Sequence, residues 1–190
     1  MKKLIVASRN KGKLKEISEI LKDFYEVESM DEAGFTVDIE ENGKTFYENS
    51  LIKARTVSLA LRCDALADDS GLCVDTLGGA PGIYSARYGG IHGDDKNNRK
   101  VLLENLEGVT DRSAKFVSSV VIHTSDGRII EGYGETTGKI ATEEIGENGF
   151  GYDNIFISDD LGKSFGIASD EEKNSVSHRY RALKNLLEQL

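Results

Sequence analysis

The sequence predicts an α/β protein with a mixed central sheet flanked by helices. An opening strand–helix–strand unit is the first observation: a buried strand at 2–7, an amphipathic pattern at about 11–21 and a weak strand at 25–29. The second is a hairpin pattern, in which residues 115–124 and 128–137 flank an Asp-Gly turn. Because the opening unit is typical of α/β proteins and the ribbon is antiparallel, we expect a mixed sheet.

Three further helices follow from amphipathic spacing and capping signals. A Thr-x-x-Glu capping box predicts a helix over about 45–61. Another is expected to begin at Asp94 or Asp95 and to stop at Gly108. The last is expected from about 177 to the end, with leucines on one stripe.

Length and composition indicate a globular protein. With 190 residues, 38% hydrophobic and 30% charged, we expect a single domain over 1–190. The short apolar run at the start ends at Ser8, and no stretch is long enough to span a bilayer, so we expect a cytoplasmic protein without membrane contact. A net charge of −9 argues against a nucleic-acid polymer as partner, but not against a nucleotide. Cys63 and Cys73 lie in apolar surroundings and are expected to be buried free thiols.

The most informative segment is 67–74, where Asp68 and Asp69 follow an apolar run and precede Ser70 and Gly71. Consecutive side chains of an extended segment point in opposite directions, so at least one carboxylate should be buried or face a cleft. A buried carboxylate needs a cation or hydrogen-bond donors, and its hard oxygens suit Mg²⁺. Taken alone, the segment is better explained as an ordinary turn between strands, and the other motifs of the chain reverse that interpretation.

Two predicted helices begin with cations, although the N-terminus of a helix disfavours them. One begins within 8–13, a segment with three cations and no acid, and the other within 177–181, with Lys173 just upstream. A phosphate against the exposed backbone N–H groups would stabilise both arrangements; solvated surface cations are the alternative. The pair Gly12-Lys13 does not form a P-loop, because the earlier glycine and the following Ser/Thr are absent.

Two other segments can take part in such a site. Acids at 38–41 precede the second predicted helix, in which Asn49 and Lys53 share a face, so an acid there can share a metal with the Asp-Asp pair. The alternative is a solvated turn. Further along, Phe150 lies between two glycines with Asp153 close behind. A flat base can stack on the open ring, worth about 1–3 kcal/mol, unless the ring packs into the core.

These segments match a known family in order. The matching stretches are 8–13, 67–72, 78–88, 149–153 and 177–179. Together they closely resemble the inosine triphosphate pyrophosphatase family, which removes non-canonical purine nucleoside triphosphates, and the resemblance covers essentially the whole chain.

The resemblance implies an elongated fold with two lobes and a cleft between them, a homodimer, and Mg²⁺-dependent hydrolysis of ITP, dITP and XTP to the monophosphate and pyrophosphate. It implies that Asp69 is the catalytic acid that orients or deprotonates water, and that Glu41, Asp68 and Asp69 bind the metal. The substrate-binding residues expected are Ser8, Arg9, Asn10, Lys11, Gly12 and Lys13 at the triphosphate, Lys53 and Ser70 nearby, Phe150, Gly151, Tyr152, Asp153 and Lys173 around the base, and His178 and Arg179 at its 6-oxo group.

The chain departs from the family pattern at Ser8 and Arg9, where many members have Thr and Gly. Two other functions also fit the residues: a pyrophosphatase for other modified or canonical nucleotides, and a non-catalytic nucleotide sensor. The paired acids weigh against a sensor, because a protein that only binds an anion gains nothing from extra negative charge unless a metal is present.

Overall fold

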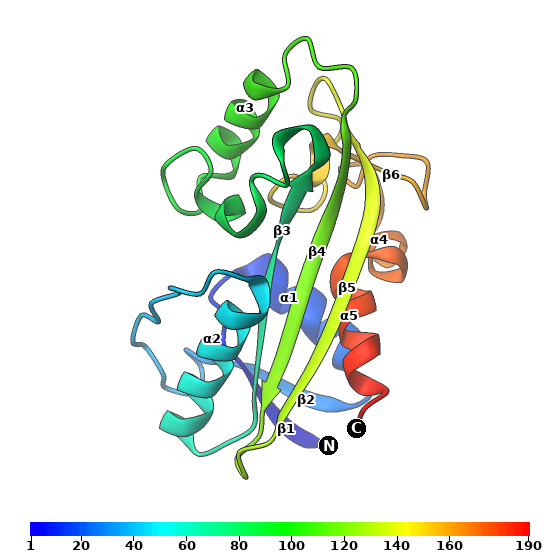
Figure 1. The fold of residues 1–190 in the computed structure, drawn as a ribbon. Coiled ribbons are helices and arrows are strands. Elements are labelled where there is room, and N and C mark those ends of the chain that lie inside the picture. The colour runs from blue at the N-terminus through cyan, green and yellow to red at the C-terminus, as the bar shows by residue number, and fades with distance from the viewer. The chain divides into compact units, whose positions relative to one another are not determined.

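The computed structural model describes all 190 residues and has one six-stranded sheet with helices packed on it (Figure 1). The strand order is β2-β1-β3-β4-β5-β6. β1 pairs in parallel with β2 and β3, whereas β5 pairs antiparallel with β6, so the predicted mixed sheet is confirmed. The strands are β1 (Lys2–Val6), β2 (Tyr25–Ser29), β3 (Ala65–Val74), β4 (Ser113–His123), β5 (Ile129–Ile140) and β6 (Phe156–Ser158).

The helices begin where their capping residues predict. Thr45 accepts a hydrogen bond from the backbone of Glu48, and Asp94 caps its helix in the same way. One helix, α4, is missing from the sequence prediction although Ser169 and Glu172 form a complete capping box at its start. The helices are α1 (Lys11–Leu21), α2 (Phe46–Leu61), α3 (Asp95–Asn105), α4 (Asp170–Val176) and α5 (His178–Leu187), with short 3₁₀ segments η1 (Asp75–Leu77), η2 (Gly82–Arg87) and η3 (Asp153–Ile155).

The chain divides into two compact units whose segments alternate along the sequence. The first unit comprises Met1–Asp69, Ser118–Gly134 and Arg179–Leu190, and the second comprises Ser70–Val117 and Glu135–His178. Strands β3, β4 and β5 each contribute residues to both units. The expectation of a single domain with two lobes stays a prediction.

The first unit has a separate apolar core on each face of its sheet. Alternation along β1 sends Leu4 and Val6 to one core and Ile5 and Ala7 to the other. The first core packs against α1 and α5, and the second packs against α2 (Figure 1). Gly132 on β5 lets α5 approach closely, because a Cβ there would collide with the Ala182 carbonyl.

The second unit has one core, built around the aromatic side chains Phe116, Phe156 and Phe165. The rings of Phe116 and Phe156 lie 4.5 Å apart between centroids. No helix of the chain is long and apolar enough to cross a membrane. Cys63 and Cys73 are free thiols, but both side chains are only half-buried, so the prediction that they are buried is wrong.

Candidate active site

The segment that begins with Asp68 and Asp69 lies inside strand β3, so it is not a turn. Side-chain alternation along β3 explains what each carboxylate meets. Asp68 points to the same face as Leu66, which belongs to the core under α1 and α5. Asp69 points to the face of Ala67, which belongs to the core under α2. The strand therefore presents one carboxylate to each layer of helices.

Asp68 is completely buried among cations and hydroxyl groups. Its Oδ2 lies 2.8 Å from Lys13 Nζ on α1 and 3.3 Å from Arg179 Nη2 on α5, and Ser118 Oγ donates to Oδ1. Burial alone would raise the pKa of Asp68. The charges of Arg179 and Lys13, together with the donated hydrogen bonds, instead hold it well below its ordinary value. Asp68 is therefore a permanent anion.

Arg179 lies between two carboxylates. Its Nη1 contacts Glu16 on α1 while Nη2 contacts Asp68, and its side chain is only 1% exposed. Burial lowers the pKa of Arg179, but Asp68 and Glu16 more than offset this and raise it. The family resemblance implies that Arg179 reads the 6-oxo group of the base. The structure instead joins its guanidinium to two side-chain anions, which provide the negative charge that a helix start rich in cations requires.

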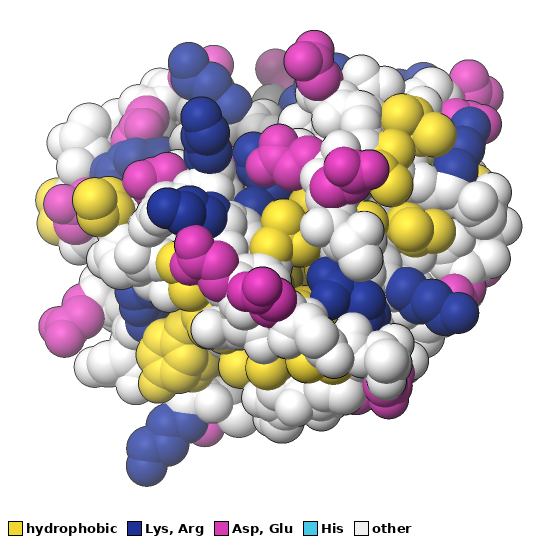
Figure 2. Space-filling model, turned by 90° about the horizontal axis from the view of Figure 1, so that it is seen from above, with side chains coloured by type: hydrophobic (Ala, Val, Ile, Leu, Met, Phe, Trp, Pro, Cys, Tyr) yellow, Lys and Arg dark blue, Asp and Glu magenta, His cyan; other side chains and the backbone are white.

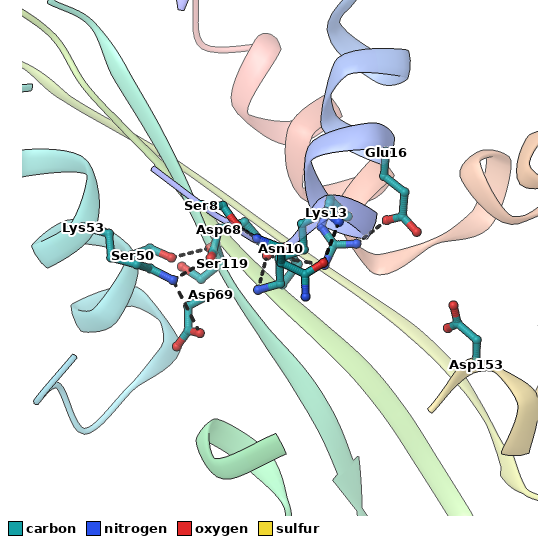
Figure 3. A network of polar contacts seen from close by, with 12 residues as sticks. Ser8, Asn10, Lys13, Glu16, Ser50, Lys53, Asp68, Asp69, Ser119 and Asp153 are labelled. Atoms are coloured by element: carbon teal, nitrogen blue, oxygen red, sulfur yellow. Dashed lines mark hydrogen bonds and ion pairs between the residues drawn. The ribbon is translucent and has the colours of Figure 1, made fainter. Parts of the chain in front are cut away.

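Asp69 lies on the α2 side, where two neighbours on that helix approach it. Asn49 Nδ2 donates to Asp69 Oδ2 at 3.1 Å. Lys53 Nζ lies 3.9 Å from Asp69 Oδ1 (Figure 3). The same Lys53 Nζ lies 2.7 Å from Glu41 Oε1 and donates to the Asp68 backbone carbonyl. Two carboxylates therefore share one ammonium group on this face of the strand.

The pKa of Asp69 is raised, whereas that of Asp68 is lowered. Burial raises it, and this effect outweighs the attraction of Lys53 and Lys13. The negative charges of Glu41 and Asp68 add to the increase. Asp69 therefore holds a proton more readily than an ordinary aspartate.

Glu41 and Asp69 are the carboxylates that fit a magnesium ion. No group of three His, Cys, Asp or Glu side chains in the chain is arranged as a metal site, so the expected set of Glu41, Asp68 and Asp69 is not assembled. The reason is that Asp68 points to the other face of β3 and is already neutralised there. Mg²⁺ usually takes one or two carboxylates and completes its shell with water and substrate phosphate, a donor set that this pair can supply.

The turn between β1 and α1 presents backbone N–H groups at a helix start. Asn10 Oδ1 caps α1 by accepting from Lys13 N at 3.0 Å, and Ser8 Oγ accepts from Asn10 N at 3.2 Å. Lys11 and Gly12 occupy the first turn, which contains no acid. These residues can receive a phosphate as the sequence predicts.

Arg9 lies in the same turn but is turned away from it. Its guanidinium binds Asp31 and Asp38 and donates to the Val37 carbonyl. The positive charge of Arg9 is thus already shared by two carboxylates. The expected role of Arg9 at the triphosphate has no support in this geometry.

In the second unit, an aromatic ring and a buried ion pair form a distinct group. Lys173 Nζ lies 2.6 Å from Asp153 Oδ2, with both side chains 5% exposed, and 4.6 Å from the centre of the Phe150 ring. Asp153 Oδ2 also accepts from Phe150 N at 2.9 Å. His178 stacks on Phe116, with 4.9 Å between ring centroids. Half-buried Phe150 is thus held by its own loop and keeps part of its surface open.

The loop that carries Phe150 is anchored by α3, which the sequence analysis did not connect with it. Asp95 Oδ2 accepts from Gly151 N at 3.0 Å, and Arg99 Nη1 donates to Gly151 O at 2.8 Å. Tyr152 is buried and donates to the Ser85 carbonyl at 2.6 Å, so it supports the loop from the core and does not face a ligand. Ser70 is half-buried on β3.

Sequence reasoning missed four contributing residues: Glu16, Ser118, and Asp95 and Arg99 on α3. Glu16 follows Lys13 by three residues, so the two lie on the same face of α1. This spacing is the only local signal in the sequence that connects Glu16 with the site. Its partner Arg179 is 163 positions away. No spacing rule joins residues so far apart.

Positive charge at the surface is interspersed with negative charge. Figure 2 shows Lys and Arg side chains next to Asp and Glu side chains on one face, with apolar side chains between them. The chain as a whole carries −9. An anion therefore has to be bound by particular cations such as Lys13 and Lys53.

Comparison with known proteins shows the family of the chain. The Ham1 family profile matches residues 4–189. The chain belongs to the Ham1 family. The predicted resemblance to nucleoside-triphosphate pyrophosphatases is thereby confirmed, since curated relatives of this Ham1 chain carry the name dITP/XTP pyrophosphatase.

Relatives match the Ham1 chain over nearly its whole length. The dITP/XTP pyrophosphatase of Clostridium perfringens is 47% identical, covering 100% of this chain and 98% of that protein. The dITP/XTP pyrophosphatase of Bacillus subtilis is also 47% identical, covering 98% and 96%. Among solved structures, a HAM1 protein from Coxiella burnetii is 37% identical with a TM-score of 0.88 and covers 100% of both chains.

Proposed function

We propose that this chain hydrolyses the non-canonical purine nucleoside triphosphates ITP, dITP and XTP to the monophosphate and pyrophosphate. The observation that carries the proposal is the arrangement on β3, where Asp68 is neutralised by Lys13 and Arg179 while Asp69 on the other face shares the ammonium group of Lys53 with Glu41. The names of relatives that are 47% identical give the substrate class.

In the proposed reaction, Asp69 acts as the general base. A water oxygen attacks the α-phosphorus, its proton passes to Asp69, and the bond from the α-phosphorus to the bridging oxygen breaks to release pyrophosphate. A carboxylate with a raised pKa accepts this proton more readily than an ordinary one. Asn49 orients the carboxylate by donating to Oδ2.

Fixed positive charge stabilises the phosphates. Lys13 is held by Asp68, and Lys53 lies beside Glu41 and Asp69. Together with the N–H groups at the start of α1, these ammonium groups provide the electrostatic stabilisation on which phosphoryl transfer depends. Mg²⁺, held by Glu41 and Asp69, would neutralise phosphate charge when bound.

The purine is assigned to the group around Phe150. A base stacked on Phe150 has Lys173 and His178 as candidate donors to a 6-oxo group. An amino group at that position cannot accept their hydrogen bonds, which would disfavour adenine. Arg179 is left out of this role because Glu16 and Asp68 hold its guanidinium.

The assay that tests this function measures pyrophosphate release from ITP, XTP, dITP, GTP and ATP, with Mg²⁺ and then with EDTA. We expect metal-dependent release that strongly favours the first three. Equal release from all five would favour the alternative of a less selective pyrophosphatase. Tight nucleotide binding without release would indicate a nucleotide sensor.

Replacing Phe150 by Ala tests the stacking role. Loss of base stacking is expected to raise KM for ITP by about tenfold with a smaller change in kcat. An unchanged KM, measured by the same pyrophosphate assay, would mean that the ring only packs within its own unit.

Cytoplasmic location and a homodimeric state are also proposed, on the strength of the sequence resemblance. Size-exclusion chromatography with light scattering tests the second. A mass of one chain at micromolar concentration would exclude the dimer.

A further inference from the structure

Arg9 makes three contacts with one segment of the chain. Its Nε lies 2.9 Å from Asp31 Oδ1, its Nη1 lies 2.7 Å from Asp38 Oδ1, and its Nη2 donates to Val37 O at 3.2 Å. Asp38 is otherwise fully exposed, and Arg9 is 35% exposed. A planar guanidinium can bind several acceptors at fixed angles, which a lysine cannot do.

The segment that Arg9 binds leads directly to the candidate metal ligand. Residues 35–43 contain no helix or strand, so side-chain contacts have to fix their course. Glu41 follows Asp38 by three residues and reaches Lys53 at 2.7 Å. Gly43 N then donates to Asn49 Oδ1 at 2.9 Å.

We propose that Arg9 is a positioning residue that holds segment 31–43 against the β1–α1 turn and so keeps Glu41 beside Lys53 and Asp69. The phosphate-binding turn and the carboxylate-bearing segment are thereby connected by one side chain. The kinetic consequence of this inference rests on the proposed function; the structural consequence does not.

Charge balance argues against the alternative of direct phosphate binding by Arg9. Two carboxylates already neutralise its guanidinium, so a third anion would meet less attraction there than at an unneutralised cation. Each exposed ion pair alone contributes about 1 kcal/mol or less to stability. Three contacts from one residue nevertheless reduce the number of conformations that an irregular segment can adopt.

The structural test is hydrogen exchange of residues 35–43 in the protein without nucleotide. In Arg9→Ala and in Asp38→Ala we expect exchange about three- to tenfold faster than in the wild type, because the segment opens more often. Arg9→Lys, which keeps the positive charge but loses the planar guanidinium group, should give an intermediate exchange rate. Arg128→Ala, which removes an exposed arginine paired with Asp126 in the same unit, is the control and should leave the segment unchanged.

The kinetic test separates positioning from phosphate binding. A positioning role predicts that both Ala variants raise the Mg²⁺ concentration for half-maximal pyrophosphate release about three- to tenfold, with nucleotide KM at saturating Mg²⁺ unchanged. It also predicts that the Arg9→Ala, Asp38→Ala double variant is no worse than Arg9→Ala alone, because Arg9→Ala already removes the contact with Asp38.

Direct phosphate binding predicts opposite signs for the two variants. Arg9→Ala would then raise nucleotide KM at saturating Mg²⁺, and Asp38→Ala would lower it by releasing Arg9 for the substrate. That pattern, or exchange rates in 35–43 equal to those of the wild type, would overturn the inference. Absence of pyrophosphate release from the wild type would refute the proposed function alone, since the exchange result still decides the role of Arg9.

Discussion

Asp68 and Asp69 are adjacent in β3, but the two faces of the strand give them opposite surroundings. On the α1 and α5 face, Asp68 is fully buried and meets Lys13, Arg179 and Ser118. On the α2 face, Asp69 shares the ammonium of Lys53 with another acid and remains partly exposed. One face has enough cations for its carboxylates, whereas the other has two carboxylates around one cation.

This difference shows how a strand can separate a structural charge from a reactive one. Neutralised Asp68 fixes the positions of Lys13 and Arg179 and has no need of a ligand. Asp69 and Glu41 leave negative charge that a divalent metal can compensate. Alternation of side chains along a strand is therefore sufficient to give neighbouring residues unrelated roles.

The largest effect is expected on stability. Asp68→Ala leaves Arg179 buried with one carboxylate in place of two, and breaking a buried ion pair typically costs about 3–5 kcal/mol. Urea unfolding measures this loss. Glu104→Ala removes an exposed acid that pairs with Lys100 along α3 and should change stability by less than about 0.5 kcal/mol. An Asp68→Ala protein as stable as this control would contradict the structural role.

The next effect is expected on turnover. Asp69→Asn should lower kcat by at least roughly 10²-fold, since an amide cannot accept the proton of the attacking water. The urea midpoint of this variant should equal or exceed that of the wild type, because burial disfavours the ionised carboxylate of Asp69. Full pyrophosphate release by this variant would remove Asp69 from the mechanism.

A smaller effect on turnover is expected from Asn49→Ala. The variant loses the hydrogen bond to Asp69 Oδ2 and the acceptor of Gly43 N, so the carboxylate is less well oriented. We expect kcat to fall about three- to tenfold, in line with the loss of one hydrogen bond. A loss as large as that of Asp69→Asn would indicate that Asn49 itself contacts the reacting groups.

The smallest effect is a change with pH. Because the folded-state pKa of Asp69 is raised, its contribution to stability is fully present below the unfolded pKa and is lost as pH rises through the folded pKa. Asp69→Asn should therefore gain stability relative to the wild type as the pH rises from the unfolded pKa of about 4 through the raised folded-state pKa. Urea unfolding of both proteins in EDTA measures the difference. A difference that shrinks as pH rises would contradict the assigned shift.

Local signals predicted most of the fold. The helix over 11–21 and the strand over 25–29 agree with α1 and β2, and the capping residues Thr45 and Asp94 mark the starts of α2 and α3. These elements depend on short-range spacing, which a sequence displays directly. Strand β6, with three residues, gives too short a pattern to recognise.

The candidate site was predicted less completely. That one of Asp68 and Asp69 is buried followed from alternation alone. The assignment of Arg179 to the base was not supported, because its carboxylate partner Glu16 lies far away in sequence. Likewise, the loop contacts of Arg9 arise from an irregular segment whose course no periodicity encodes.

The contact between Glu16 and Arg179 joins the first helix of the chain to the last. During synthesis, Lys13 and Asp68 emerge long before the arginine that completes their ionic cluster. Asp68 therefore has no guanidinium partner until α5 has left the ribosome, and the ionic cluster of the first unit is complete only from that point. A chain truncated before α5 would leave Asp68 buried with only one of its two cations.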